Sequence, residues 1–259
     1  YRNAKCVRLK GKVMTSVGQT SMPLNVGDEI GTYIVTEQIG TGGMASVYKA
    51  QHKRLNRNVA IKVMHPNMRA DSGFLARFER EARIVAGLEH PNIVPIYDFD
   101  DHRDEPYLVM KFINGETLKD RLRDGILTSE TTITLMTQIA DALTYAHNQG
   151  VLHRDIKPSN ILLNTDNKPY LTDFGLARII QSGESTMSAE MMLGTPHYIS
   201  PEQARGNTDL DARTDVYSLG IILYEMLTGQ VPFTGDTAYA IVHDQIYTDP
   251  PAPRTINPE

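Results

Sequence analysis

A lysine in the middle of an apolar strand pattern constrains the fold of this chain more than any other feature. Residues 58–64 (NVAIKVM) alternate as a β-strand does, and Lys62 shares one face with Ala60 and Met64. Burying an ammonium group there costs several kcal/mol unless an anionic group lies beside it. The alternative is an edge strand whose lysine extends into solvent. The pattern therefore directs attention to acidic residues elsewhere in the sequence.

A helix with a buried carboxylate is predicted next along the chain. An apolar stripe at helical spacing runs through residues 71–92 and consists of Phe74, Phe78, Ala82, Val85 and Leu88. Glu81 lies on this face, and Asp71 or Ser72 is expected to cap the helix. The alternative for Glu81 is a solvated flank of the stripe. Because a buried carboxylate and a buried ammonium account for each other, we expect Glu81 to pair with Lys62.

A glycine cluster precedes this strand. Residues 33–52 (YIVTEQIGTGGMASVYKAQH) alternate on both sides of the cluster, which predicts a strand, a tight turn and a second strand. An ordinary hairpin is one interpretation. The other is a turn in which Gly40, Gly42 and Gly43 allow backbone amides to approach a phosphate chain.

Charged side chains are concentrated in residues 153–160 (HRDIKPSN). Before them, residues 133–150 carry apolar side chains at helical spacing and end in Gly150, as expected for a helix with a glycine cap. After them, residues 161–164 (ILLN) form a short apolar run suited to a strand. A loop held between two packed elements is a frequent location for catalytic groups.

Composition excludes several classes of protein. With 26 basic and 31 acidic residues the formal net charge is −5, which argues against nucleic acid as the main partner. Cys6 is the one cysteine, so no internal disulfide forms and a reducing compartment is expected. No run approaches the roughly 20 apolar residues of a membrane span. Residues 1–27 lack periodicity, which predicts a flexible leader.

Taken together, these segments resemble the eukaryotic-type (Hanks-type) serine/threonine protein kinases, and bacterial members in particular, over about residues 33–250. The motifs that carry the resemblance follow the family's order: IGTGGMASVYKA, VAIK, EREARI, HRDIKPSN, DFG and SPEQ. The resemblance implies an α+β fold with two lobes in a domain over residues 28–259. The N-lobe, about residues 28–113, would hold an antiparallel sheet with one key helix. The C-lobe, about residues 114–259, would be mainly α-helical and lack the family's last helices.

The resemblance implies an enzyme that transfers the γ-phosphoryl group of ATP to serine or threonine hydroxyls of proteins. The residues it places in catalysis are Asp155, Lys157, Lys62 and Glu81. Asp155 would orient the acceptor hydroxyl and Lys157 would neutralise the transferring group, while Lys62, fixed by Glu81, would hold the α and β phosphates. Asn160 and Asp173 would hold Mg²⁺, or Mn²⁺ in its place.

The implied nucleotide site joins the glycine turn to the linker between the lobes. Its residues are Ile39, Gly40, Thr41, Gly42, Gly43, Met44, Ala45, Ser46, Val47, Ala60, Lys62, Met110, Lys111, Phe112, Ile113 and Leu162. Val47, Ala60 and Leu162 would enclose the adenine ring, although plain core packing also explains them. Met110 would control the back pocket, and Glu116 or a neighbour would reach the ribose.

The implied regulatory site is the segment that follows Asp173. Its residues are Arg154, Arg178, Ser182, Ser185, Thr186, Ser188 and Thr195. Phosphorylation of a hydroxyl within residues 182–188, by the protein itself acting in trans, would place a phosphate on the two arginines. Thr195 would contact Asp155 and Lys157, and His153 would pack under Phe174.

Four positions depart from the family's pattern. Ala45 replaces the third loop glycine, Lys111 stands where an acidic residue is common, and Ser200 replaces an alanine. Glu202 is expected to lack its usual arginine partner. The alternatives to an active protein kinase are a pseudokinase or nucleotide-binding scaffold, and a small-molecule phosphotransferase. Protein substrates and a cytoplasmic location are expected, with a membrane anchor beyond residue 259 left open.

Overall fold

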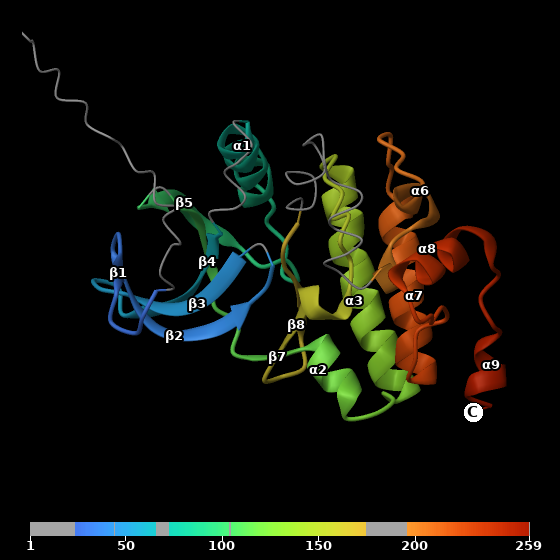
Figure 1. Ribbon diagram of the computed structural model, residues 1–259. Helices are drawn as coiled ribbons and strands as arrows, with labels where there is room; N and C mark the ends of the chain where they lie inside the picture. Colours follow the sequence, from blue (N-terminus) through green and yellow to red (C-terminus); the bar gives the residue numbers. More distant parts are fainter. Residues whose placement is uncertain (1–23, 44, 66–72, 104, 175–195, 259) are drawn as a thin grey trace, which may run out of the picture.

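The computed structural model describes residues 24–43, 45–65, 73–103, 105–174 and 196–258, and it has two lobes (Figure 1). Strands gather in the first lobe and helices in the second, as predicted. The strands are β1 (Glu29–Ile30), β2 (Tyr33–Thr41), β3 (Ala45–His52), β4 (Arg57–Met64), β5 (Ile96–His102), β6 (Glu105–Lys111), β7 (Gly115–Thr117), β8 (Ile161–Asn164) and β9 (Pro169–Leu171). The α-helices are α1 (Phe74–Ala86), α2 (Leu118–Arg123), α3 (Ser129–Asn148), α6 (Pro201–Ala204), α7 (Arg213–Thr228), α8 (Ala238–Tyr247) and α9 (Pro253–Ile256).

The first lobe is built on a six-stranded antiparallel sheet in the order β1-β2-β3-β4-β6-β5. The predicted strand, glycine turn and strand correspond to β2 and β3, in which Thr41 pairs with Ser46. In β4, Lys62 pairs with Val47 on one side and with Leu108 on the other, so its strand is internal. The edge-strand alternative for Lys62 is therefore wrong.

The two faces of β4 bury different clusters. Val59, Ile61 and Val63 pack in one apolar cluster, whereas Ala60 and Met64 pack in another. This division matches the alternation predicted from the sequence. Lys62 consequently lies on the face that also packs against α1.

Helix α1 carries the predicted apolar stripe next to β5. Its buried residues are Phe74, Phe78, Glu81, Ala82 and Val85. Gly73 occupies the N-cap of the described helix and provides no side-chain hydrogen bond, while the predicted caps Asp71 and Ser72 lie outside the described residues. Glu81 is 8% exposed, so the solvated-flank alternative is also wrong.

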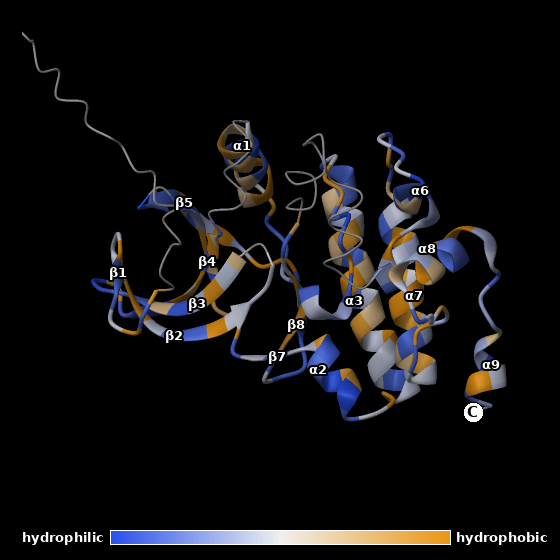
Figure 2. Cartoon of the chain, in the orientation of Figure 1, coloured by the Kyte–Doolittle hydropathy of each residue, from blue (hydrophilic) through white to orange (hydrophobic). Residues whose placement is uncertain are grey.

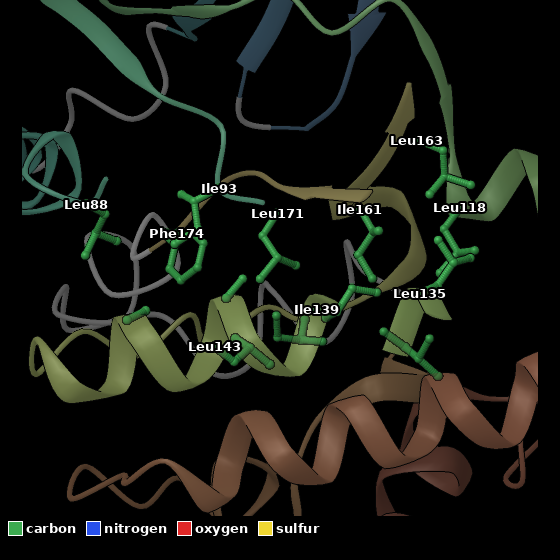
Figure 3. Packing of buried hydrophobic residues seen from close by; sticks show 14 of the residues in the cluster. Leu88, Ile93, Leu118, Leu135, Ile139, Leu143, Ile161, Leu163, Leu171 and Phe174 are labelled. Carbon is green, nitrogen blue, oxygen red and sulfur yellow. The ribbon is translucent and has the colours of Figure 1, made fainter. Parts of the chain in front are cut away.

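Helices α3 and α7 form the framework of the second lobe, with Thr128 capping α3 through a bond from the Thr131 amide. Helix α2 is largely hydrophilic in Figure 2, whereas apolar segments recur along α3 and α7. Leu135, Ile139 and Leu143 of α3 belong to one buried cluster with residues of β8 and β9, part of which Figure 3 shows. This packing holds the segment between α3 and β8, residues 149–160, against the core. In the described part of the chain no helix is long and apolar enough to span a membrane.

A small sheet of β7, β8 and β9 joins the lobes, and its close backbone packing yields a prediction. A Cβ atom at Gly115 would lie 1.8 Å from the Leu163 carbonyl oxygen, whereas a Cβ at Gly220, inside α7, would meet nothing within 4 Å. Gly115→Ala is therefore expected to destabilise the protein by about 2 kcal/mol or more. Gly220→Ala is expected to stabilise it by about 0.5–1 kcal/mol, because alanine favours an exposed helix position. Chemical denaturation of both variants checks this, and a Gly115→Ala protein as stable as the wild type would contradict it.

Candidate active site

Asp155 is held by two neighbours within the charged loop. Lys157 Nζ lies 2.7 Å from Asp155 Oδ2, and the Asn160 amide nitrogen donates to the same oxygen at 3.0 Å and to the Asp155 carbonyl at 2.9 Å. The Asp155 side chain keeps 41% of its surface exposed, so its carboxylate stays accessible to a second molecule. An accessible carboxylate with a fixed orientation can accept or orient the proton of a hydroxyl.

His153 anchors the loop to the buried core of the second lobe. It is fully buried, and its Nε2 donates to the Thr172 carbonyl at 2.9 Å, which requires the proton on that nitrogen. Its ring centroid lies 4.5 Å from that of Phe174, which confirms the predicted packing. Phe174 itself points into the apolar cluster beside Ile93 and Leu171 (Figure 3).

A buried carboxylate that sequence reasoning missed anchors the loop backbone. Asp215 of α7 is fully buried and accepts from the amides of His153 at 2.8 Å and Arg154 at 2.7 Å. His147 Nε2 donates to it at 2.7 Å. Burial alone would raise the Asp215 pKa, but these donors hold it below its ordinary value. An acidic residue on the buried side of an apolar helix was the signal available in the sequence.

These bonds explain an unusual backbone conformation. Arg154 adopts a φ of +66°, in the left-handed region that side chains other than glycine rarely occupy. Its amide is held by Asp215, and its carbonyl accepts from Gln203 Nε2 of α6 at 2.8 Å. The strained residue is thus fixed on both sides immediately before Asp155.

Lys62 forms its ion pair with Asp173. The two groups lie 2.8 Å apart, and both side chains are largely buried. Burial alone would raise the Asp173 pKa, but the charge and hydrogen bond of Lys62 hold it below its ordinary value. Asp173 also has a φ of +68°, so this residue too is held in a rarely populated conformation.

The predicted pair of Lys62 with Glu81 is wrong for this structure. Asp173 follows β9 and presents a desolvated carboxylate directly to Lys62, and this nearer acid takes the ammonium. Glu81 lies on the inner face of α1, where it is engaged elsewhere. The sequence established that Lys62 needs an acidic partner but not which of two acids lies nearer.

Asn160 and Asp173 suit a hard cation. The Asn160 amide nitrogen is directed to Asp155, and its oxygen, which accepts a long bond from the Ser159 hydroxyl at 3.5 Å, keeps a second lone pair for another partner. Backbone bonding links the two residues, since the Thr172 amide donates to the Asn160 carbonyl at 3.0 Å. Among the described residues no group of three or more His, Cys, Asp or Glu side chains is arranged to hold a metal ion by itself. Mg²⁺ usually binds to one or two protein oxygens and completes its shell with phosphates and water, so these two residues fit it.

The glycine turn and the apolar residues predicted around adenine converge on one cluster. Gly42 donates its amide to the Ala45 carbonyl at 2.9 Å, which closes the turn. The cluster includes Ala45, Val47, Ala60, Met110, Phe112, Ile113 and Leu162. Ile39 is 44% exposed at the end of β2 and does not join it. Met110 also lines a small cavity of about 20 Å³ together with Glu81 and Phe174.

The linker between the lobes begins at Lys111. Its amide donates to the Pro95 carbonyl at 3.0 Å, so this donor is not available to a ligand. Its ammonium lies 5.0 Å from the centre of the Tyr170 ring, which accounts for a cation where an acidic residue was expected. Phe112 and Ile113 remain as the linker residues whose backbone groups are predicted to meet adenine.

The segment that begins at residue 196 is tied to the helices around it. Ser200 and Gln203 form a capping box on α6, so Ser200 has a structural role that alanine could not fill. Glu202, which was expected to lack its usual arginine partner, accepts from the Thr214 hydroxyl at 2.8 Å. The predicted site residues Met44, Arg178, Ser182, Ser185, Thr186, Ser188 and Thr195 lie outside the described residues.

Comparison with known proteins identifies similar sequences and structures. The family described as "Protein kinase domain" matches residues 33–258. The chain is 43% identical over 238 residues to a probable serine/threonine-protein kinase PknB of Bifidobacterium longum, covering 88% of this chain and 34% of that protein. It is 42% identical over 227 residues to the serine/threonine-protein kinase PknB of Mycobacterium tuberculosis, covering 85% and 36%. The chain thus spans about a third of the length of these relatives.

A solved structure shows the same arrangement of the two lobes. The kinase domain of PknI from Mycobacterium tuberculosis superposes with a TM-score of 0.72 at 29% sequence identity. The match covers 91% of this chain and 86% of that one. The two-lobed α+β fold expected from the sequence is therefore confirmed.

Proposed function

Because the chain belongs to the protein kinase domain family, we propose that it transfers the γ-phosphoryl group of ATP to serine or threonine hydroxyls of proteins. The observation that carries the proposal is the arrangement of Asp155, with Lys157 and Asn160 bonded to one of its carboxylate oxygens. This arrangement presents an oriented base beside a cation and an amide oxygen. Phosphoryl transfer needs mainly positioning and charge stabilisation, and these three groups supply both.

Each residue has a defined task in this proposal. Asp155 orients the acceptor hydroxyl and accepts its proton, while Lys157 neutralises charge on the transferring phosphoryl group. Lys62 would hold the α and β phosphates of the nucleotide, and Asp173 with Asn160 would hold the metal ion. Mg²⁺, or Mn²⁺ in its place, supplies charge neutralisation of the phosphates when bound.

A pseudokinase or nucleotide-binding scaffold is the less favoured alternative. Such relatives lack one of the residues that the chemistry needs, whereas Lys62, Asp155, Asn160 and Asp173 are all present here. Their bonding to one another in the described residues favours an active enzyme.

We also propose that the protein phosphorylates itself in trans within residues 182–188. The cation expected to receive that phosphate is Arg154, together with Arg178. Arg154 is placed by the backbone bonds of Asp215 and Gln203 at the base of the catalytic loop. Four hydroxyls, those of Ser182, Ser185, Thr186 and Ser188, lie in that stretch of the sequence.

Because the proposed reaction uses ATP, we propose that this part of the protein lies in the cytoplasm.

The experiment that tests this function is incubation of the purified protein with radiolabelled ATP and Mg²⁺, with and without a generic protein substrate. Phosphoserine and phosphothreonine are expected after acid hydrolysis, and mass spectrometry of the protein alone should locate phosphate within residues 182–188. The Asp155→Asn protein, purified in the same way, is the control for a contaminating kinase. Label that is mainly phosphotyrosine, or equal labelling by the control, would contradict the proposal.

A further inference from the structure

His65 connects the glycine turn to the strand that carries Lys62. It is the first residue after β4, where Ala45 pairs with Met64 in the last position of the ladder. Its Nε2 lies 2.9 Å from the Ser46 hydroxyl, and its Nδ1 lies 3.2 Å from the Gly43 carbonyl. One imidazole thus bonds both sides of the turn from the end of a neighbouring strand.

The chemistry of the partners fixes the proton on this ring. The Gly43 carbonyl can only accept, so Nδ1 carries a hydrogen and donates to it. In the neutral ring, Nε2 then accepts from the Ser46 hydroxyl, which is 8% exposed. The Ser46 oxygen lies 3.3 Å from the Thr41 hydroxyl, so the bonding continues into the last residue of β2. In this series of hydrogen bonds from Gly43 through His65 and Ser46 to Thr41, each donor therefore faces an acceptor.

Holding the Gly43 carbonyl fixes the plane of its peptide bond, because peptide units are rigid. A glycine turn otherwise has more conformational freedom than any other backbone segment, and a ligand that needs one conformer must first restrict it. His65 and Lys62 belong to one continuous stretch of chain. The ring therefore sets the turn in a constant position relative to the ammonium group.

We propose that His65 is a positioning residue for the nucleotide, holding the glycine turn and Lys62 in register so that both meet the same phosphates. This inference rests on the proposed function, because it assumes that ATP binds beneath the turn. It assigns His65 no contact with the phosphates and no part in proton transfer. Loss of the ring lowers the fraction of molecules whose turn is ready to bind.

Three substitutions separate the two bonds of the ring. In His65→Asn the short amide can donate to Gly43 but cannot reach Ser46, whereas in His65→Gln the longer amide can reach Ser46. His65→Ala removes both bonds. We expect the dissociation constant of magnesium ATP to rise about fivefold to tenfold in His65→Ala, and by about twofold to threefold in each amide variant, since single hydrogen bonds contribute modestly. The ATP KM should rise in parallel while kcat stays within about twofold.

His52 supplies a matched control on the same sheet. Its Nδ1 accepts from the amides of Arg54 and Leu55 in the turn after β3, so His52→Ala also removes a ring that bonds backbone. His52→Ala should leave the ATP dissociation constant unchanged. A Ser46→Ala variant, alone and combined with His65→Asn, which also loses the bond to Ser46, tests whether the two residues act through one bond. The effects of these two changes should not add, because either change removes the same bond.

The outcomes distinguish this inference from the proposed function. An ATP affinity that is unchanged in His65→Ala, or additive effects of Ser46→Ala and His65→Asn, would overturn the inference while wild-type binding keeps the function intact. Weakened ATP binding in both His52→Ala and His65→Ala, with lower melting temperatures, would indicate a general effect on the sheet and overturn it as well. A wild-type protein that binds no magnesium ATP would overturn both proposals.

Discussion

Asp155→Asn is expected to lower the rate of phosphoryl transfer by about 10³-fold, because general acid–base groups contribute about 10²–10⁴-fold. Asparagine preserves the shape of the side chain but cannot accept the hydroxyl proton. The Asp155 carboxylate faces outward with 41% of its surface exposed, so its loss should leave nucleotide affinity nearly unchanged. The measurement is kcat for a protein substrate beside a titration with magnesium ATP.

Lys62→Met is the matched comparison, because it removes a charge from the other side of the same site. Transfer should be lost here as well, but nucleotide affinity should fall about 10-fold to 100-fold, in keeping with about 1.5–3 kcal/mol for a charged hydrogen bond. Lys53→Met is a suitable control, since Lys53 pairs with Glu29 at the surface of the same sheet. If Asp155→Asn lost nucleotide as severely as Lys62→Met, the assigned roles would be wrong.

The elements nearest the site could be predicted because their signals are local. The alternation around the glycine cluster specified β2 and β3, and the face of β4 that carries Lys62 followed from period-two spacing alone. The helical stripe of α1 likewise placed Glu81 inside. Its cap could not be predicted, since Asp71, Ser72 and Gly73 all suit an N-cap and the backbone conformation decides among them.

The remaining part of the site depends on long-range geometry. Two acids, Glu81 and Asp173, were available to Lys62, and the sequence does not state which one the fold brings within 2.8 Å. Asp215 escaped notice because two of its three partners are backbone amides more than 60 residues away, and an amide carries no residue identity. His65 was missed for the same reason, as one of its two partners is the Gly43 carbonyl.

Asp215→Asn should both destabilise the protein and lower its activity, in contrast to Asp155→Asn. The buried carboxylate accepts three hydrogen bonds, from His147 and from the amides of His153 and Arg154. An asparagine must turn its NH₂ group toward one of these donors, which leaves buried donors facing each other. We expect a loss of about 3 kcal/mol in the free energy of unfolding, the range seen when one member of a buried charged pair is removed. The catalytic rate should fall too, because the strained Arg154 conformation that precedes Asp155 would lose its anchor.

The pH dependence of stability distinguishes this anchoring from simple packing. The folded-state pKa of Asp215 lies below its ordinary value of 3.8, so its contribution to stability is complete above about pH 4 and is lost as the pH falls through the lower folded-state value. Wild-type stability should therefore decline more steeply below pH 4 than that of Asp215→Asn, and the two curves should converge in acid. Asp211→Asn is the control, because Asp211 pairs with Arg213 at the exposed start of α7, where water screens the pair and its replacement should leave stability nearly unchanged. Parallel curves of stability against pH for wild type and Asp215→Asn between pH 7 and pH 3 would show that the Asp215 charge does not hold the loop. The difference in stability between Asp215→Asn and Asp155→Asn would then come from the shape of the side chain alone.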